Sequence, residues 1–263
     1  MNDAYDSAFY AQQKDGSYVS ASVVVPHILS LFKPSSVADF GCGVGTWLRA
    51  LLDVGVTDIT GVDGDYVRDE LLVIPSERFV RADLTRPIDL GRTFDLVVSL
   101  EVREHLPKES APVFVQTLTR HSKVVLFSAA IPFQGGTYHI NEQWPQYWNG
   151  LFSEHGYSCV DSLRGLFWHD DRIEWWYRQN MLLFVANDTL SGFSSRSPAS
   201  VAPLDLVHPA LFLATYGRLA EADGRLAEEA RPIGVTTALK RIPHALLNTL
   251  RWRLARTKIS TSP

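Results

Sequence analysis

The stretch Val37-Ala38-Asp39-Phe40-Gly41-Cys42-Gly43-Val44-Gly45-Thr46-Trp47-Leu48 joins an apolar segment to a helical pattern through three alternating glycines. Glycines at alternate positions remove Cβ atoms where a chain turns sharply from strand to helix, so the backbone can lie against a ligand. Asp39 opens this turn. A dinucleotide site places pyrophosphate at the helix N-terminus and has no use for a carboxylate there, whereas an ammonium or sulfonium ligand tolerates one. The stretch therefore predicts a nucleotide-type cofactor site for a ligand with a positive charge.

Strand and helix patterns alternate along the following residues. Apolar segments predict strands near 37–40, 58–62, 78–82, 94–100 and 123–129, and Cys159–Leu163 and Met181–Ala186 supply two more. A leading or lid helix is expected over Tyr18–Phe32. This alternation predicts an α/β fold with a Rossmann-like, seven-stranded, mostly parallel sheet that has helices on both faces.

The composition changes after Ala186, where a run rich in Ser, Gly and Pro indicates a linker. We therefore divide the chain into a domain at 1–187, a linker at 188–207 and a helical appendage at 208–263. The segment 236–258 mixes apolar and basic residues, as do helices that lie on anionic membranes or on a partner helix. Alternatively it packs on its own domain or on a second subunit. Pro243 interrupts the apolar face and favours packing.

Composition excludes several classes of protein. The 263 residues carry a formal net charge of −4. The chain therefore lacks the basic charge that is typical of nucleic-acid-binding proteins, and small molecules or neutral glycans are better candidates for its substrate. No apolar run approaches the roughly 20 residues of a bilayer-spanning helix, and the N-terminus lacks a basic and apolar leader. With Cys42 and Cys159 as its only cysteines, the chain predicts neither a disulfide framework nor a thiolate zinc site, and a cytoplasmic location is expected.

The pattern Asp-x-Gly-x-Gly-x-Gly at 39–45 resembles motif I of the class I S-adenosylmethionine-dependent methyltransferases, and three later segments follow that family's order. They are Gly61–Gly64, Phe79–Leu84 and Phe94–Glu101. The resemblance implies S-adenosylmethionine as cofactor. It assigns cofactor binding to Asp39, Gly41, Gly43, Asp63, Gly64, Ala82, Asp83, Leu84 and Leu100. A nicotinamide oxidoreductase would instead show Gly-x-Gly-x-x-Gly.

The fourth strand runs into Glu101-Val102-Arg103-Glu104-His105. If a helical turn begins at Glu101, Glu104 and His105 point to the same side as Glu101. Carboxylates this close repel one another unless they are protonated or neutralised, and a divalent cation neutralises them. Mixed oxygen and nitrogen ligands suit Mg²⁺ or Mn²⁺ better than structural zinc. The alternative is a Glu-His pair that shapes the cofactor pocket without a metal.

A glycine-rich loop after the fifth strand, 134–145, presents His139 among polar and aromatic residues. Loops at the carboxyl ends of parallel strands meet over the ligand crevice, so His139 can reach Glu101, Glu104 and His105. This set resembles the metal-dependent small-RNA 2′-O-methyltransferases, which implies a metal that binds vicinal hydroxyls at these four residues. The chain shows no RNA-binding module. A role for His139 as general base, or as a structural residue, stays open.

Over residues 17–187 the chain also resembles bacterial class I methyltransferases that O-methylate sugars and glycans, on the segments 127–132, 139–144 and 174–180. A narrower similarity to the actinobacterial 1-O-methyltransferases of methylmannose polysaccharide synthesis implies the 1-OH of a mannoside. Arg103 departs from the usual small residue there and is expected to alter the pocket entrance. Several aromatic residues between 144 and 177 could together form a surface that binds sugar rings. For any single one of them, burial in the apolar core is the better explanation.

These observations predict an enzyme that transfers a methyl group from S-adenosylmethionine to a sugar or oligosaccharide hydroxyl. A Mg²⁺ or Mn²⁺ ion would bind adjacent hydroxyls, with Glu101, Glu104 and His139 as the catalytic residues. One alternative is a metal-independent methyltransferase with His139 or His105 as general base. Another is a non-catalytic, cofactor-binding regulator that contacts a partner through its tail. A homodimer or a membrane-surface contact through the same tail is also expected.

Overall fold

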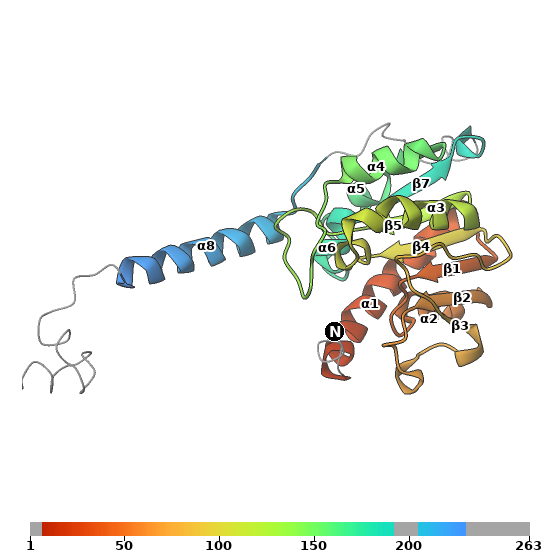
Figure 1. The fold of residues 1–263 in the computed structure, drawn as a ribbon, viewed down its shortest axis with the longest axis horizontal. Helices are drawn as coiled ribbons and strands as arrows, with labels where there is room; N and C mark the ends of the chain where they lie inside the picture. Colours follow the sequence, from red (N-terminus) through yellow and green to blue (C-terminus); the bar gives the residue numbers. More distant parts are fainter. Residues whose placement is uncertain (1–6, 192–204, 230–263) are drawn as a thin grey trace, which may run out of the picture. The chain divides into compact units, whose positions relative to one another are not determined.

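The computed structural model describes residues 7–191 and 205–229, with side chains for 16–191 and 205–226. Its main elements run in chain order, and Figure 1 labels most of them. They are α1 (Ser7–Phe32), β1 (Ser36–Phe40), α2 (Thr46–Asp53), β2 (Asp58–Asp63), β3 (Phe79–Arg81), β4 (Leu96–Leu100), α3 (Ala111–His121), β5 (Val124–Ser128), α4 (Pro145–Glu154), β6 (Tyr157–Val160), α5 (Leu163–Phe167), α6 (Trp175–Asn180), β7 (Leu182–Ala186) and α8 (Pro209–Glu229).

The strands form one seven-stranded sheet in the order β3-β2-β1-β4-β5-β7-β6. β1 to β5 pair in parallel, and β7 runs antiparallel to both of its neighbours, β5 and β6. The predicted Rossmann-like, mostly parallel sheet is confirmed. The prediction of a strand over Cys159–Leu163 is partly wrong, because β6 ends at Val160 and Leu163 already begins α5. An apolar run of this length does not distinguish a strand end from the first turn of a buried helix.

Both faces of the sheet are covered by helices. Successive residues of β5 alternate between two apolar cores: Val124 and Leu126 belong to one, Val125 and Phe127 to the other. The first core is completed by side chains of α1, α2, α5 and α6, and the second by side chains of α3 and α4. Because every strand residue of β5 is buried, the strand reads as a continuous apolar run, as expected for a sheet with two covered faces.

The chain turns from β1 to α2 through glycines with left-handed backbone angles. Gly41, Gly43 and Gly45 have φ values of 88°, 54° and 90°. A Cβ atom on Gly41 would overlap the side chain of Val102, which follows β4. The turn after β1 and the turn after β4 therefore lie in contact at the carboxyl edge of the sheet, where this fold class binds its ligands.

The proposed division of the chain stays a prediction. Most of the expected linker and the amphipathic segment 236–258 lie outside the described residues, while the first part of the expected appendage is α8. One compact unit extends to Thr215, and a second begins at Tyr216. None of the helices at 7–191 and 205–229 is long and apolar enough to span a bilayer. Cys42 and Cys159 are both buried and free.

Candidate active site

A first cavity opens where the chain turns after β1, β2 and β4. It contains six of the residues predicted to bind the cofactor, which come from four separate segments of the chain: Asp39, Gly41, Gly43, Asp63, Leu84 and Leu100. The other lining residues include Ser17 of α1, Trp47 of α2 and Tyr177 of α6. The Tyr177 hydroxyl is 2.9 Å from the Ser17 Oγ and 3.4 Å from the Trp47 Nε1. The leading helix thus contributes directly to the wall of this cavity.

Two buried carboxyl groups give the first cavity a strong preference for positive charge. Burial, together with the nearby Asp63, holds the pKa of Asp39 well above its usual range. Burial also raises the pKa of Asp63, although hydrogen bonds from Tyr66, Gly64 and Gly43 oppose that shift. The Gly43 N–H donates to Asp63 Oδ2 at 2.6 Å. A cationic ligand would relieve the repulsion between the two acids.

Three residues of the predicted cofactor set do not line this cavity. The Gly64 N–H donates to Asp63 Oδ1 at 2.7 Å, and the Ala82 N–H donates to the Asp63 carbonyl at 2.8 Å. The Asp83 carboxylate is exposed and accepts hydrogen bonds from the Thr85 backbone and hydroxyl at 2.9 and 2.6 Å. Asp83 therefore caps the turn that follows β3, which is a strong local competitor for a short acidic side chain.

A second cavity adjoins the first. Glu101, His105 and Tyr177 line both, so these side chains form the wall between them. The remaining lining comes from four segments that are far apart in the sequence: Gly16 of α1, Glu104 after β4, the loop residues Gln134–Thr137 and His139, and Glu174, Trp175 and Trp176 at the start of α6. Two cavities with a shared wall are what a reaction between a cofactor and a second substrate requires.

The turn after β4 differs from the predicted one. Glu101 has a left-handed backbone (φ 53°), and a short 3₁₀ helix spans Arg103–His105. The prediction of a helical turn that begins at Glu101 is therefore wrong; the turn begins two residues later. The Glu101 N–H donates to the Ser128 carbonyl and hydroxyl of β5, both at 3.1 Å, and these bonds hold the chain out of helical geometry. Glu104 and His105 nevertheless reach the second cavity.

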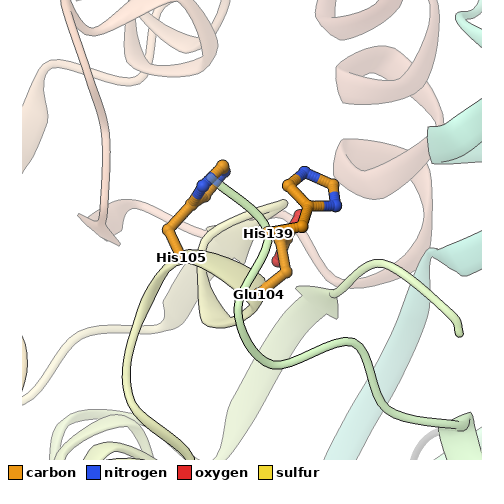
Figure 2. A group of neighbouring side chains, drawn as sticks. All are labelled: Glu104, His105 and His139. Atoms are coloured by element: carbon orange, nitrogen blue, oxygen red, sulfur yellow. The ribbon is translucent and has the colours of Figure 1, made fainter. Parts of the chain in front are cut away.

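Glu104, His105 and His139 form a compact cluster at the second cavity. Figure 2 shows Glu104 and His105 on one turn and His139 on the loop that crosses it. One potential ligand atom from each residue lies within 4.8 Å of the others. The two imidazole rings meet edge to face with centroids 4.9 Å apart. Glu101, the fourth predicted ligand, lines the same cavity but is not a member of this cluster.

The electrostatics of the cluster favour a bound cation. Glu104 is fully buried, and neither carboxylate oxygen has a hydrogen-bond partner of normal geometry. Burial and the neighbouring Glu101 hold the pKa of Glu104 well above its usual range. Burial and the nearby His139 lower the pKa of His105 to about 4, so this imidazole is neutral at neutral pH. A buried, unpartnered carboxylate beside two imidazoles is a donor set that fits a divalent metal ion.

The loop that carries His139 is fixed by one carboxylate. Glu142 accepts hydrogen bonds from the backbone of Phe133 and Gly135, both at 2.7 Å, and lies 2.9 Å from His139 Nδ1. This contact leaves His139 Nε2 as the nitrogen available to a ligand. A Cβ atom on Gly136 would overlap the His139 ring, so the loop packs closely around the imidazole. The Ile140 and Asn141 N–H groups donate to the Glu104 carbonyl at 2.8 and 3.1 Å and tie the loop to the turn after β4.

Arg103 does not alter the entrance to either cavity, contrary to the prediction. Its side chain is fully buried in the core on the α3 and α4 side, with the guanidinium 5.6 Å from the ring centroids of both Phe114 and Trp148. Burial lowers its pKa to about 10. The long stem and flat guanidinium allow an arginine to pack between aromatic rings.

The aromatic residues divide between core and cavity. Trp148 is buried in the core, whereas Trp175, Trp176 and Tyr177 line the second cavity. Gln134, Glu142, Gln179 and Asn180 have no predicted role, although Glu142, Gln179 and Asn180 lie in segments that carried the resemblance to sugar methyltransferases. The three-residue spacing of His139 and Glu142 was the available signal for their pairing. No local pattern indicates that Gln134, Gln179 and Asn180 meet at Glu101.

Comparison with known proteins supports the fold and the family. Residues 20–176 match the family model described as a methyltransferase domain. The chain belongs to this family. Together with the glycine turn and the acid-lined first cavity, this membership identifies a methyltransferase that depends on S-adenosylmethionine. No curated protein sequence matches the chain significantly.

Three solved structures illustrate the similarity of the fold. The sugar N-methyltransferase KedS8 from Streptoalloteichus sp. ATCC 53650 has a TM-score of 0.55 and 16% identity, and the match covers 71% of this chain and 94% of that chain. The amino pentose methyltransferase CalS10 from Micromonospora echinaspora, solved with S-adenosylmethionine, has a TM-score of 0.50, 15% identity and coverages of 71% and 99%. Magnesium protoporphyrin IX methyltransferase from Synechocystis PCC 6803 has a TM-score of 0.50, 20% identity and coverages of 66% and 83%.

Proposed function

We propose that this methyltransferase acts on a sugar or oligosaccharide hydroxyl, and that Glu104, His105 and His139, together with Glu101, hold a divalent cation at the second cavity. The first cavity would hold S-adenosylmethionine, and the second would hold the acceptor. The observation that carries the proposal is the cluster of Glu104, His105 and His139 beside the wall that the two cavities share.

The cluster supports a metal for a physical reason. A carboxylate without partners in a fully buried position costs several kcal/mol of desolvation unless it is protonated or neutralised. His105 stays neutral and thus keeps a lone pair for a ligand. Glu142 orients His139 through Nδ1, as the outer-shell partner of a metal-binding histidine does. Mixed carboxylate and imidazole ligands without thiolates favour Mg²⁺ or Mn²⁺.

The chemistry is a displacement at carbon. The acceptor oxygen forms a bond to the methyl carbon while the bond from that carbon to sulfur breaks, giving a methyl ether, S-adenosylhomocysteine and a proton. A bound cation would lower the pKa of the acceptor hydroxyl and fix its position. Glu101, His105 and Tyr177 line both cavities and would therefore lie between the bound cofactor and the acceptor. His139, if it is not a ligand, is the residue to take the proton.

Aromatic and acidic side chains favour a sugar as the acceptor. Trp175 and Trp176 are partly exposed and line the second cavity beside the Glu174 carboxylate. Indole faces pack on the apolar faces of sugar rings, and a carboxylate accepts hydrogen bonds from hydroxyls. The sugar methyltransferases among the solved structures of similar fold agree with this class of acceptor. Within that class, the 1-OH of a mannoside is the specific acceptor we propose.

The test is calorimetric titration of chelator-treated protein with S-adenosylmethionine and then with Mg²⁺ and Mn²⁺. We expect cofactor binding in the wild type and in Glu104→Gln and His139→Ala, and metal binding in the wild type alone. Transfer of labelled methyl to a panel of mannosides, with and without the hydroxyl next to the reacting one, then tests the acceptor. Cofactor binding without any metal response would contradict the metal site.

A second candidate function is metal-independent O-methylation with His139 as general base. The contact between His139 Nδ1 and Glu142 favours it, because a carboxylate at one ring nitrogen fixes the imidazole and leaves Nε2 to accept the proton of the acceptor hydroxyl. His105 is a poorer base, because its pKa of about 4 gives it little affinity for a proton at neutral pH. Methyl transfer that persists after complete chelation would favour this mechanism.

A further inference from the structure

Three side-chain amides connect the segment before α8 to Glu101. The His208 N–H donates to Gln179 Oε1 at 2.7 Å. Gln179 Nε2 donates to Gln134 Oε1 at 3.2 Å and to Asn180 Oδ1 at 3.0 Å. Gln134 Nε2 then donates to Glu101 Oε2 at 2.9 Å, and Asn180 Nδ2 donates to Glu101 Oε1 at 3.0 Å. We call Gln134, Gln179 and Asn180 the amide relay.

The direction of the relay is fixed at both ends. A backbone N–H only donates, so His208 requires the oxygen of Gln179 on its side. The Gln179 NH₂ group must then face Gln134 and Asn180, whose oxygens accept from it. The Ile131 N–H, 3.3 Å from Gln134 Oε1, gives Gln134 the same orientation independently. Asn180 Nδ2 also donates to Gln134 Oε1 at 2.9 Å. Gln134 and Asn180 therefore each present an NH₂ group to Glu101, whose carboxylate can only accept.

The relay lies in a rigid environment. Gln134, Gln179 and Asn180 are 7%, 0% and 3% exposed. The carbonyl of Gln179 also accepts from Arg164 Nη1 at 3.3 Å, and Arg164 is itself buried and paired with Asp161. Buried amides that find partners for both of their ends have a single low-energy arrangement, because reversing one of them would leave donors facing donors.

The two acids after β4, Glu101 and Glu104, thus differ in their hydrogen-bond donors. Each oxygen of Glu101 has an amide donor, so the carboxylate is held in one orientation at the wall between the cavities. Glu104, three residues later, has no such donors. Fixing a reacting-site carboxylate within a fraction of an ångström contributes to the rate without contact between the fixing residues and the substrate.

We propose that Gln179 is a positioning residue that orients Glu101 through Gln134 and Asn180, and that the His208 N–H sets the direction of this relay. The importance of Glu101 orientation for metal and acceptor rests on the proposed function, whereas the relay itself does not. The segment that precedes α8, which lies beyond the matched residues 20–176, thereby contributes to the active site. Gln179 and Asn180 line neither cavity and act through Glu101, whereas Gln134 also lines the second cavity.

The first experiment tests the relay in the full-length wild type by NMR. Side-chain amide signals are assigned from their loss in Gln134→Glu and Asn180→Asp. The relay predicts that the amide protons of Gln134 and Asn180 exchange with solvent at least about 100-fold more slowly than those of an exposed amide, and that Glu101→Gln removes this protection. This measurement needs no metal and no acceptor. Exchange at the rate of a free amide would overturn the proposal.

The second experiment measures Mn²⁺ affinity in the presence of S-adenosylmethionine. Gln179→Met keeps the volume and removes the donors, and Gln179→Glu keeps the acceptor for His208 but removes the donors. Both are expected to weaken Mn²⁺ binding by about 10-fold. The matched control is Tyr157→Phe, which removes buried hydrogen bonds to the Ser122 and Thr119 carbonyls, remote from the site. Tyr157→Phe should lower the thermal stability about as much as the Gln179 variants do, and its Mn²⁺ affinity should stay that of the wild type.

A double substitution separates positioning from general damage. If Gln179 acts through Glu101, Gln179→Met adds nothing to the effect of Glu101→Gln on Mn²⁺ affinity. Additive losses, or a Gln179→Met protein with the affinity of Tyr157→Phe, would overturn the proposal. If the wild type binds no Mn²⁺, the proposed metal function fails, and the exchange measurement alone decides on the relay.

Discussion

The two cavities that meet at Glu101, His105 and Tyr177 are built in opposite ways. The first is formed by short segments at the ends of adjacent parallel strands, and one of its acids, Asp63, accepts several local hydrogen bonds. The second takes most of its lining from the turn after β4, the loop after β5 and the start of α6, and its most buried acid, Glu104, has no hydrogen-bond partner of normal geometry. Both cavities favour a positive charge, but only in the first do local hydrogen bonds offset part of the cost of burying an acid.

This difference separates general from specific function. A glycine turn and strand-end acids are sufficient for a cofactor that many methyltransferases share. The second cavity depends on contacts between distant segments, such as the Ile140 N–H to the Glu104 carbonyl at 2.8 Å. Substitutions there should alter metal and acceptor binding and leave cofactor binding intact.

The largest effect is expected for Glu104→Gln. Loss of this ligand should weaken Mn²⁺ binding by roughly 100-fold or more, while S-adenosylmethionine affinity changes by less than about 3-fold because Glu104 does not line the first cavity. Replacing this desolvated carboxyl group by a neutral amide should not lower the thermal stability of the metal-free protein. Titration calorimetry and thermal unfolding measure the three quantities. The exposed Glu109→Gln is the control, and equal loss of cofactor and metal binding would contradict the separation of the cavities.

Glu142→Gln should have the next largest effect. The carboxylate orients His139 and holds two backbone N–H groups of the same loop, so its loss should weaken Mn²⁺ binding by about 10-fold to 100-fold. The measurement is Mn²⁺ titration at saturating S-adenosylmethionine. An unchanged Mn²⁺ affinity would show that His139 is not a ligand and would favour its role as a base.

Gly136→Ala tests the packing of the loop against the His139 ring. The added methyl group would overlap the imidazole, so the ring or the loop must shift, and we expect Mn²⁺ affinity to fall by about 3-fold to 10-fold with unchanged cofactor affinity. The matched control is Gly150→Ala in α4, where a Cβ meets nothing within 4 Å. The control should be neutral or stabilising by about 0.5 kcal/mol. Identical behaviour of the two variants would contradict the close packing.

The smallest effect concerns pH and stability. The pKa of His105 is about 4 in the folded protein against 6.5 for the free side chain, because burial disfavours the charged ring. As pH falls, the unfolded chain binds this proton first, so His105 contributes stability that is complete above pH 6.5 and is lost towards pH 4. The loss should be about 2 kcal/mol between pH 7 and pH 5. The free energy of unfolding is measured by denaturant titration for the wild type and for His105→Asn at pH 7 and pH 5. The difference between the two proteins at each pH gives the contribution of His105. A difference that does not change with pH would contradict the burial of a neutral ring.

Much of the fold and part of the site follow from local sequence patterns. Apolar runs and glycines placed the seven strands within a few residues, because both depend on local burial and backbone geometry. The turn at Glu101 was wrong because hydrogen bonds to Ser128, on another strand, determine its backbone. The burial of Arg103 and the meeting of Gln134, Gln179 and Asn180 were not predictable, since they depend on side chains brought together only by the tertiary fold.

The most direct test of the central claim is a crystal structure with S-adenosylhomocysteine and Mn²⁺, measured with anomalous scattering from the metal. We predict an anomalous peak at the second cavity, within coordination distance of a Glu104 oxygen and of nitrogens of His105 and His139. Absence of a peak in crystals that contain the cofactor product, or a peak that none of these three residues contacts, would contradict it.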